Sequence, residues 1–389
     1  MTPSVQQIPE DTSAAVPEKL TTTTIKETPK VKRQIEVEGG KTDAKHPLYL
    51  PTWNHGQKYP PLEPFTHIEH SIGASPKFPD LLPSGSKIQK LTPTIGSEVT
   101  GVQLSTLTSA GRDQLALLVA QRKVVVFRDQ GFADLPLQEA LDFGCYFGRH
   151  HIHPTSGSPE GYPELHIVHR YGAPGTSEFD SFLAGRNSSV SFHSDVTYEA
   201  QPPGTTFLYI FDSPETGGDT VFVNQVEAYN RLSEPLKERL HGLRAVHSGF
   251  EQAQFSRDKE GVVRREPVKN EHPIVRTHPA TGEKALFVNQ GFTRSIVGLK
   301  KEESEALLAF LFNHISRGID YQARVRWAPR TVVVWDILMR DFKNRVTVHS
   351  ATLDWSDGSR RHLARITPQA EAPFETPYAK PEKEANALP

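Results

Sequence analysis

The stretch SFHSDVTYEAQPPGTTFLYIFDSPETGGDTVFVN, residues 191–224, decides how the chain can fold. Its first part is expected to form a strand that carries His193 and Asp195. Its last part, PETGGDTVF, is typical of a turn that leads into a second strand. Because residues i and i+2 of a strand point to the same face, the imidazole and the carboxylate converge on one spot. We therefore expect the rest of the chain to be built around this pair of side chains.

A histidine and a carboxylate on one face supply two of the three protein ligands of a facial metal site. A site of two histidines and one carboxylate leaves coordination positions open and is typical of non-haem Fe(II) oxygenases. The third ligand must then come from elsewhere in the chain. With 17 histidines in the sequence, however, a His-x-Asp triplet also arises by chance, as a surface pair or as a hydrogen-bonded core histidine. The remaining sequence has to decide between these interpretations.

Length and composition describe a chain without a strong charge. The 389 residues suffice for one large domain or two ordinary ones, and 36% of them are hydrophobic. The formal net charge of −2 gives no electrostatic reason to expect nucleic acid or an acidic membrane surface as a partner. The single cysteine, Cys145, excludes an intramolecular disulfide framework and fits a reducing compartment.

The sequence carries no sign of membrane insertion or export. No apolar run reaches the roughly 18 residues that a membrane-spanning helix needs. The first residues, MTPSVQQIPEDTS, lack the apolar core of a secretory signal. We therefore expect a cytoplasmic protein.

Shifts in composition divide the chain into four parts. Residues 1–45 are rich in Thr, Pro, Lys and Glu without an apolar period, so we expect a disordered N-terminal tail. Residues 46–93 alternate aromatic residues with prolines, which is typical of an extended arm laid across a domain surface. A globular domain is expected over residues 94–368, and a second tail, rich in Pro, Glu and Ala, over residues 369–389.

Within the expected domain, short strand patterns outnumber helix patterns. Apolar residues at helical spacing predict helices over 107–123, 135–148, 226–243 and 299–317. Strand patterns occupy 95–104, 124–129, 164–172, 321–328 and 331–336, with a strand and its exit over 245–255 and two strands around the turn PATGE over 272–289. This pattern favours a mainly β fold with flanking helices, in which a barrel or sandwich carries the helices on its outside.

The segment RVTVHSATLDWSDGSRRHLARIT, residues 345–367, is expected to be a hairpin whose two strands are joined by the turn DWSDGS. His349 lies on the first strand, and Arg361 and Arg365 lie on the second. Because the two arginines are four residues apart, they point to the same face of that strand. Four strand residues span roughly 13 Å, so the two cations can bind two different anions.

A second histidine-rich segment, RHHIHPTSG at residues 149–157, contains His150, His151 and His153. The side chains of His151 and His153 could share one side of an extended segment, which would suit a zinc site with three histidines. A histidine before a proline at a loop entry is also commonly structural. The residues alone leave both interpretations open.

Four motifs, taken together, are specific. They are HSD at 193–195, GGDT at 217–220, VTVHSATLDW at 346–355 and RRHLAR at 360–365. In this order they resemble the taurine dioxygenase family, over roughly residues 95–368. The arm at 46–93 further resembles the fungal sulfonate dioxygenase branch. The resemblance implies a double-stranded β-helix (jelly roll) and an enzyme that needs Fe(II), with 2-oxoglutarate and O2 as co-substrates.

The resemblance also implies roles for individual residues. His193, Asp195 and His349 match the iron ligands of the family. Thr220 and Arg361 match the residues that hold the distal carboxylate of 2-oxoglutarate, as suits a hydroxyl donor and a guanidinium fork. The residues that match or lie near the family's substrate pocket are His153, Val196 with its backbone N–H, Arg365, Tyr198, Phe250 and Phe292.

The implied reaction is hydroxylation of the carbon next to the sulfonate of an organosulfonate, with release of sulfite, an aldehyde, succinate and CO2. Arg365, His153 and the Val196 N–H would bind the sulfonate. Ser156 and Ser189 replace an aromatic residue and an amide of the taurine enzyme, so the resemblance does not extend to taurine itself. The family also leaves a homodimer or a homotetramer open.

The clearest departure from the family is the segment ILMRDFK, residues 337–343, which separates Asp336 from the strand that carries His349. We expect this insertion to bulge outward at the end of the barrel, because surface loops tolerate insertions. Two alternatives to organosulfonate hydroxylation stay open. One is the same chemistry on aryloxyalkanoates or alkyl sulfates, and the other is an inactive jelly roll that binds a small anion or a protein partner.

Overall fold

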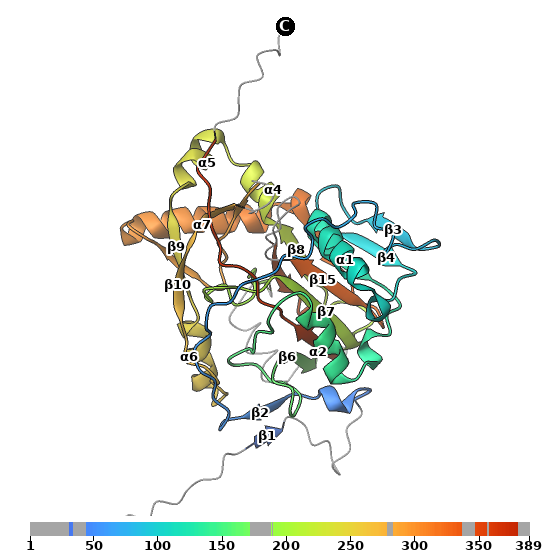
Figure 1. Ribbon diagram of the computed structural model, residues 1–389. Coiled ribbons are helices and arrows are strands. Elements are labelled where there is room, and N and C mark those ends of the chain that lie inside the picture. Colours follow the sequence, from blue (N-terminus) through green and yellow to red (C-terminus); the bar gives the residue numbers. More distant parts are fainter. Residues whose placement is uncertain are drawn as a thin grey trace, which may run out of the picture.

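The structure, a computed structural model, describes residues 31–33, 44–171, 188, 190–277, 283–336, 347–355 and 358–379. The predicted insertion at 337–343 lies outside these residues, as do Ser189, most of the predicted N-terminal tail and residues 380–389 of the predicted C-terminal tail. In the described part, strands outnumber helices and form two main sheets, with helices outside them (Figure 1). No helix in this part is long and apolar enough to cross a membrane.

The larger sheet has the strand order β3-β4-β5-β15-β7-β17-β6. In that order its strands are β3 (Lys87–Lys90), β4 (Ser97–Thr100), β5 (Val124–Phe127), β15 (Val332–Asp336), β7 (Thr205–Asp212), β17 (Arg360–Ile366) and β6 (Leu165–Tyr171). Neighbours are antiparallel except β4 and β5, which are parallel. Every residue of β5 is buried, as its continuous apolar sequence VVVF predicts for a strand covered on both faces.

The smaller sheet has the order β14-β8-β16 and consists of β14 (Gln322–Val325), β8 (Thr220–Asn224) and β16 (Thr347–Ala351). The ring of Phe222 on β8 packs against that of Trp335 on β15, with centroids 5.5 Å apart. Both rings belong to one buried cluster that joins the two sheets. Two sheets packed face to face are the architecture expected of a jelly roll.

Two helices cover the outer face of the larger sheet, α1 (Ser109–Arg122) and α2 (Leu137–Cys145) (Figure 1). The hydroxyl of Thr108 accepts the Gly111 N–H at 3.2 Å and so caps the N-terminus of α1. Phe143 of α2 packs against Phe207 of β7 with ring centroids 5.4 Å apart, inside a buried cluster that also contains the apolar side of α1.

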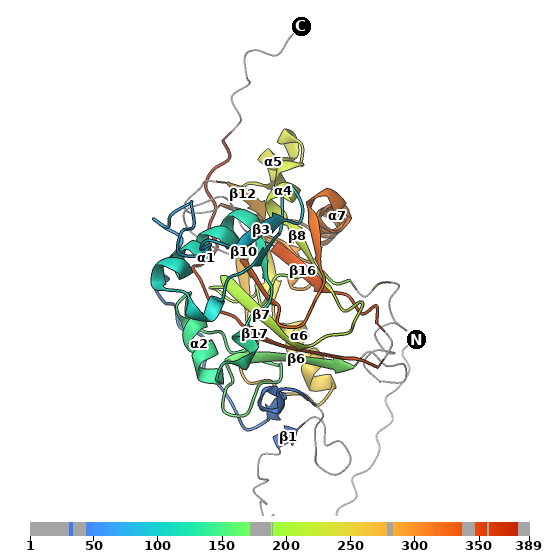
Figure 2. The ribbon, with the colours of Figure 1, turned by 90° about the vertical axis from the view of Figure 1, so that its right-hand side faces the viewer.

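A second group of elements covers the smaller sheet. It contains a three-stranded sheet with the order β10-β9-β13 and a two-stranded sheet, β11-β12. Its elements are β9 (Arg244–Ser248), β10 (Lys269–Pro273), β11 (Val275–Thr277), β12 (Lys284–Leu286), β13 (Thr293–Ile296), α4 (Gln225–Asn230), α5 (Glu234–Leu240), α6 (Phe250–Asp258) and α7 (Lys301–Arg317). Figure 2 shows α4 and α7 beside β8. Leu308 and Leu311 of α7 share a buried cluster with Val223 of β8 and Val348 of β16.

The hairpin predicted over 345–367 is wrong. Strand β16 belongs to the smaller sheet and β17 to the larger one, so the two strands are not hydrogen-bonded neighbours. The residues between them pack on the turn before β8. The Thr352 N–H donates to Asp219 O at 2.9 Å, and the Gly218 N–H donates to Asp354 Oδ1 at 2.9 Å. This crossing places the functional side chains of β16 and β17 on different sheets.

The segment 245–255, predicted to be a strand and its exit, contains a strand followed by the start of a helix that was not predicted. Strand β9 stops at Ser248, and α6 begins at Phe250 after Gly249. The Ser248 hydroxyl accepts the Phe250 N–H at 3.2 Å and donates to Glu251 at 2.6 Å, which supports the first turn of the helix. Ala253 is the only buried residue of α6. The helix therefore lacks the wide apolar stripe by which a helix can be recognised from its sequence.

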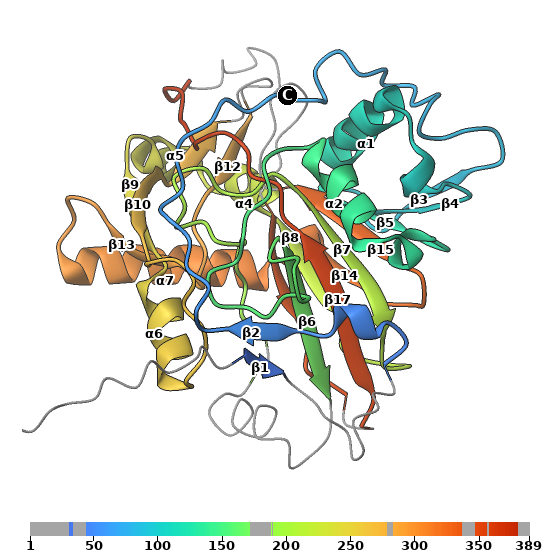
Figure 3. The same cartoon turned by 60° about the horizontal axis from the view of Figure 1, so that its bottom comes forward.

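Residues 46–93 lie on the domain surface and contain little regular structure. Strand β2 (Thr52–Asn54) pairs with β1 (Val31–Arg33), and the Thr52 N–H donates to Ser158 O at 2.8 Å. Figure 3 shows this segment crossing in front of β6 and continuing past α6.

Short 3-10 helices occur at Pro47–Tyr49, Leu104–Thr106, Phe132–Asp134 and Ile319–Tyr321.

Candidate active site

His193 and His349 come together through their backbones. They form an isolated antiparallel bridge, in which the His193 N–H donates to His349 O at 3.0 Å and the His349 N–H donates to His193 O at 2.8 Å. Residues paired across such a bridge place their side chains side by side, and the two ring centroids are 4.5 Å apart. The strand predicted through Asp195 does not form, because the chain turns over residues 195–198 directly after the bridge.

Asp195 completes a cluster that could hold a metal ion. One ligand atom from each of Asp195, His193 and His349 lies within 4.8 Å of the other two. Asp195 Oδ1 is 3.7 Å from His193 Nε2, and Asp195 Oδ2 is 3.8 Å from His349 Nε2. The structure therefore brings together the three residues that the sequence motifs single out, although a turn rather than a strand aligns the first two.

The donor atoms of the cluster fit a cation. His193 Nδ1 donates to Ser191 O at 3.0 Å, which leaves the Nε2 lone pair directed at the cluster. Asp195 Oδ2 is buried and accepts no hydrogen bond from the described residues. A buried carboxylate oxygen without a donor is costly, whereas a divalent cation would satisfy it. Two imidazoles and one carboxylate are a donor set that suits Fe(II).

The protonation states of the cluster also suit metal binding. Burial lowers the pKa of His349 to about 3, although the negative charge of Asp195 opposes this shift. Burial alone would raise the pKa of Asp195, but the charge of Arg365, followed by those of His349 and His193, lowers it to about 2. At neutral pH, His349 is therefore neutral and Asp195 is ionised, which are the forms that bind metals.

Arg361 and Thr220 form a second polar group. Arg361 Nε donates to Gly218 O at 2.7 Å, and its Nη2 donates to Thr220 Oγ1 at 3.4 Å. The guanidinium is buried and forms no ion pair with an acidic side chain of the described residues. Burial, together with the charge of Arg170, lowers the pKa of Arg361 to about 9, so it stays charged at neutral pH. A buried guanidinium of this kind needs an anionic partner.

The turn that presents Thr220 depends on both glycines of the GGDT motif. Gly217 has φ +80° and Gly218 has φ +64°, which are left-handed values that favour glycine. A Cβ on Gly217 would lie 2.8 Å from Asp354 O, and a Cβ on Gly218 would lie 3.2 Å from Arg361 Cδ. The motif therefore allows the turn to approach the arginine closely.

Arg365 forms a third polar group beside the metal cluster. It lies directly opposite His166 in the register of β17 and β6. Its Nη1 donates to Asp195 Oδ1 at 2.5 Å, and its Nη2 donates to His166 Nδ1 at 2.6 Å. The ring of His153 lies next to that of His166, with centroids 4.6 Å apart. Sequence analysis misses His166, because neither strand alone shows that β6 and β17 are neighbours.

One cavity of about 750 Å³ joins the three groups. The predicted site residues that line it are His153, His193, Asp195, Val196, Thr220, Phe292, His349, Arg361 and Arg365. Lining residues that the sequence analysis misses include Trp53, His166, Arg170, Gln252, Phe255 and Lys259. The cavity thus places a candidate metal centre and two separately held arginines in one chamber.

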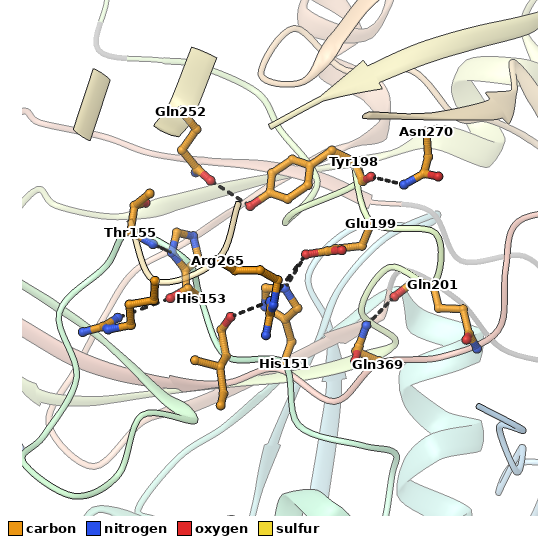
Figure 4. Close-up of polar contacts among 12 residues, drawn as sticks. His151, His153, Thr155, Tyr198, Glu199, Gln201, Gln252, Arg265, Asn270 and Gln369 are labelled. Atoms are coloured by element: carbon orange, nitrogen blue, oxygen red, sulfur yellow. Dashed lines mark hydrogen bonds and ion pairs between the residues drawn. The ribbon is translucent and has the colours of Figure 1, made fainter. Parts of the chain in front are cut away.

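Two predicted pocket residues do not line this cavity. Tyr198 is buried behind its wall, where its hydroxyl donates to Gln252 Oε1 at 2.8 Å and its ring packs on Phe292 with centroids 5.1 Å apart (Figure 4). Phe250 is 49% exposed at the start of α6 and is not among the residues that line the cavity. Residue 250 lies at the start of a helix where the sequence pattern predicts the exit of a strand, and its role in substrate binding stays a prediction.

Helix α6 contributes a different set of side chains. Gln252, Phe255, Ser256 and Lys259 line the cavity. They follow the i, i+3, i+4, i+7 spacing of one helix face, continued into the residue that caps the helix. The ammonium group of Lys259 lies 4.6 Å from the centroid of the Phe255 ring. One face of α6 is therefore a wall of the chamber.

The three-histidine zinc hypothesis for residues 149–157 is wrong. His150 Nε2 is 2.9 Å from Leu141 O, and His151 Nε2 is 2.9 Å from Glu199 Oε1, so these rings are used in structural contacts. Figure 4 shows His151 and Arg265 together on Glu199, apart from His153. In the described part of the chain, these histidines belong to no group that could hold a metal.

The family model "Taurine catabolism dioxygenase TauD, TfdA family" matches residues 87–367. The chain belongs to this family. It is 45% identical over 336 residues to the alpha-ketoglutarate-dependent sulfonate dioxygenase of Saccharomyces cerevisiae, which covers 85% of this chain and 79% of that protein. It is 32% identical over 290 residues to the alpha-ketoglutarate-dependent sulfate ester dioxygenase of Pseudomonas putida, over 72% of this chain and 88% of that protein.

A solved structure of the same family has the same fold. The crystal structure of a taurine dioxygenase from Burkholderia xenovorans superimposes with a TM-score of 0.58 at 31% identity, over 75% of this chain and 91% of that chain. The predicted jelly-roll fold is therefore confirmed. The protein is a 2-oxoglutarate-dependent dioxygenase, and the predicted requirement for Fe(II), 2-oxoglutarate and O2 is confirmed as that of its family.

Proposed function

We propose that the protein hydroxylates the carbon next to the sulfonate group of a small organosulfonate. The hydroxylated product would break down to sulfite and an aldehyde, while 2-oxoglutarate is converted to succinate and CO2. The observation that carries the proposal is the pair of buried arginines, Arg361 and Arg365, that line the cavity of the metal cluster. Because each has its own set of partners, the cavity can hold two anions at once.

The first anion is 2-oxoglutarate. Arg361 and Thr220 would hold its distal carboxylate, since the guanidinium has no acidic partner among the described residues and the Thr220 hydroxyl lies beside it. His193, Asp195 and His349 would hold Fe(II) at the other end of the co-substrate. When bound, Fe(II) supplies the activation of O2 that is coupled to decarboxylation of 2-oxoglutarate.

The second anion is the sulfonate of the substrate, which Arg365, His153 and the backbone N–H of Val196 would bind. His153 Nδ1 accepts the N–H groups of Thr155 and Ser156 at 3.3 and 3.1 Å, so its proton must lie on Nε2. Burial, followed by the charge of Arg365, lowers the pKa of His153 well below its usual value. His153 therefore contributes a hydrogen bond to the sulfonate and not a positive charge.

Two further arguments support this assignment. The Saccharomyces cerevisiae relative is named a sulfonate dioxygenase, and the Pseudomonas putida relative is named for sulfate esters, whose head group presents the same three terminal oxygens. The alternative of an inactive anion-binding jelly roll is disfavoured because the metal cluster and both arginines are all in place.

The test is a substrate panel assayed with Fe(II), 2-oxoglutarate and O2. Alkanesulfonates, alkyl sulfates and aryloxyalkanoates are offered in parallel, and succinate is measured in each case, with sulfite for the sulfonates. We expect sulfonates to increase succinate formation and to release sulfite in equal amount. Succinate formation that only aryloxyalkanoates increase would contradict the proposed substrate class. A protein that forms succinate with no member of the panel would contradict the proposal altogether.

A further inference from the structure

His166 is a cavity residue to which neither the motifs nor the proposed reaction gives a role. It lies on β6 directly opposite Arg365 of β17, and its ring faces the cavity beside the ring of His153. The residues that share this side of β6 and line the cavity are His166, Val168 and Arg170, whereas His169 points away and packs against His362 with ring centroids 5.0 Å apart.

The hydrogen bonds of His166 determine where its proton lies. The guanidinium of Arg365 can only donate, and its Nη2 is 2.6 Å from His166 Nδ1, so Nδ1 must be an acceptor. The proton of the neutral imidazole is then on Nε2. Burial, with the charge of Arg365 next to the ring, lowers the pKa of His166 well below its usual value, as expected for a neutral ring.

The cavity therefore contains two imidazole donors beside one guanidinium. The Nε2–H of His166 and the Nε2–H of His153 have no acceptor among the described residues, and the two ring centroids are 4.6 Å apart. Arg365 uses one N–H of Nη1 on Asp195 and one N–H of Nη2 on His166, which leaves the second N–H of each terminal nitrogen for a ligand. His153, His166 and Arg365 thus line one region of the cavity and carry N–H groups for which the described residues offer no acceptor.

We propose that His166 is a further substrate-binding residue, whose Nε2–H donates to one oxygen of the substrate anion and makes the site selective for head groups with three terminal oxygens. This inference rests on the proposed function and names the residue that separates sulfonates and sulfate esters from carboxylates. A sulfonate can give one oxygen to each of His153, His166 and Arg365. A carboxylate has only two oxygens, so one buried donor would stay unpaired, which is costly.

A simpler role for His166 is to orient Arg365 without touching the substrate. Two substitutions separate these roles, because they keep different halves of the imidazole. In His166→Asn, the amide oxygen replaces the Nδ1 acceptor of Arg365, and the donor at the Nε2 position is lost. In His166→Gln, the longer side chain returns an amide N–H to the Nε2 position, and the acceptor close to Arg365 is lost. The matched control is His169→Asn, on the opposite face of the same strand.

The probes are hexanesulfonate and heptanoate, which carry the same six-carbon chain on different head groups. Each is titrated calorimetrically into the protein loaded with Fe(II) and 2-oxoglutarate without oxygen, so that binding is measured apart from turnover. A lost hydrogen bond to a charged group predicts that His166→Asn weakens hexanesulfonate binding by roughly tenfold or more. Heptanoate binding should change little. His166→Gln should recover most of the hexanesulfonate affinity, and His169→Asn should behave as the unaltered protein.

Two patterns of binding by the His166 variants would contradict this role. If His166→Asn binds hexanesulfonate normally while His166→Gln does not, His166 only orients Arg365. If His166→Asn weakens both probes equally, His166 does not select the head group. The affinity for 2-oxoglutarate, held by Arg361, shows whether each variant is folded and loaded. Failure of the proposed function is a separate result, because the unaltered protein would then release no sulfite, whatever the substitutions at residue 166 do to binding.

Discussion

Asp195 divides its two carboxylate oxygens between different partners. Oδ1 accepts the Arg365 Nη1–H at 2.5 Å, whereas Oδ2 faces His349 and has no hydrogen-bond donor in the described part of the chain. A cation bound only by the folded protein stabilises it by mass action. We therefore predict that Mn(II), used in place of Fe(II), raises the Tm of the metal-free protein and that a chelator reverses the increase, as scanning calorimetry can measure.

The same measurement tests the ligands one by one. His349→Ala should fold, because the substitution removes a ring at the cavity surface, but Mn(II) should no longer raise its Tm. Fe(II)-dependent turnover should be abolished in the same variant. A His349→Ala protein that keeps either the Tm increase or full turnover would show that His349 is not a ligand.

Substitution of Arg361 and substitution of Arg365 should impair the binding of two different anions. Arg361→Ala should weaken 2-oxoglutarate and lower succinate formation with and without substrate. Arg365→Ala should instead raise the KM for a sulfonate by about a hundredfold, or ~3 kcal/mol, because one partner of a buried charge pair is lost. The slow decarboxylation of 2-oxoglutarate without substrate should survive in this variant.

Assays of the arginine variants need saturating Fe(II), because Arg365→Ala also removes the hydrogen bond to Asp195 Oδ1. Succinate and sulfite are measured against the concentration of each substrate in turn. If Arg365→Ala loses 2-oxoglutarate affinity while its KM for the sulfonate is unchanged, the assignment of Arg361 to 2-oxoglutarate and of Arg365 to the sulfonate is refuted.

The pH dependence of sulfonate binding distinguishes hydrogen-bond donors from charges. Burial and the charge of Arg365 lower the pKa values of His153 and His166 well below the usual histidine value, so both rings are already neutral at pH values where an ordinary histidine still carries a proton. Because a group with a lowered pKa has already lost its proton, raising the pH from about 6 to 8 should remove no charge from the site. We predict a flat KM for the sulfonate over this interval in steady-state assays. A KM that climbs steadily with pH would show that a protonated histidine binds the anion.

At the scale of single residues, the sequence predicts the candidate metal cluster better than the side chains around it. His193, Asp195 and His349 are found from motifs, because ligand chemistry restricts which residue types can stand there. The contact between Arg365 and Asp195 joins residues from a turn and from a strand of the larger sheet, and no spacing within either motif reveals it. His166 is hidden for the same reason, since its role depends on the register of β6 against β17.

Helix α6 offers a test at the scale of one element, because two phenylalanines of the same helix differ in position. Phe255 lines the rim of the cavity, whereas Phe250 is exposed and does not line it. Phe255→Ala should raise the KM for hexanesulfonate by roughly fivefold, or ~1 kcal/mol of lost apolar contact, and leave ethanesulfonate unchanged. Phe250→Ala is the control and should change neither. Equal effects of the two substitutions would mean that α6 does not contact the substrate chain.

Elements were predictable where local sequence and packing agree. Strand β5 is an unbroken apolar run that is buried throughout, and α1 has an apolar sequence that is buried from Gln114 to Ala120 together with the Thr108 cap. Helix α6 was missed because it buries little of its surface, and the hairpin over 345–367 was wrong because its two strands pair with different sheets. The second error has a physical origin, since turn residues specify a reversal of the chain but not the sheet that the next strand joins.

The whole molecule contributes to the cavity through segments far apart in sequence. Arg264 joins its own segment to two others. Its guanidinium donates to His153 O at 3.2 Å and to Ser156 O in one segment, and to Thr52 O in the arm. The neighbouring Trp53 lines the cavity, and a Cβ on Gly157 would lie 2.8 Å from its ring. The arm is therefore packed as a wall of the chamber, and it was not predicted to be one because its sequence shows only that it is extended.

The wall formed by the arm predicts how Trp53 affects the reaction. Exclusion of water from the chamber keeps decarboxylation of 2-oxoglutarate coupled to attack on the substrate. Trp53→Ala should open the chamber, so that succinate forms in excess over sulfite while binding of Mn(II) and 2-oxoglutarate is unchanged. The control is Leu48→Ala on the same arm, because Leu48 is 74% exposed and does not line the cavity. Both products are measured in one reaction with hexanesulfonate. If Trp53→Ala still yields equal amounts of succinate and sulfite, the arm covers the domain without closing its active site.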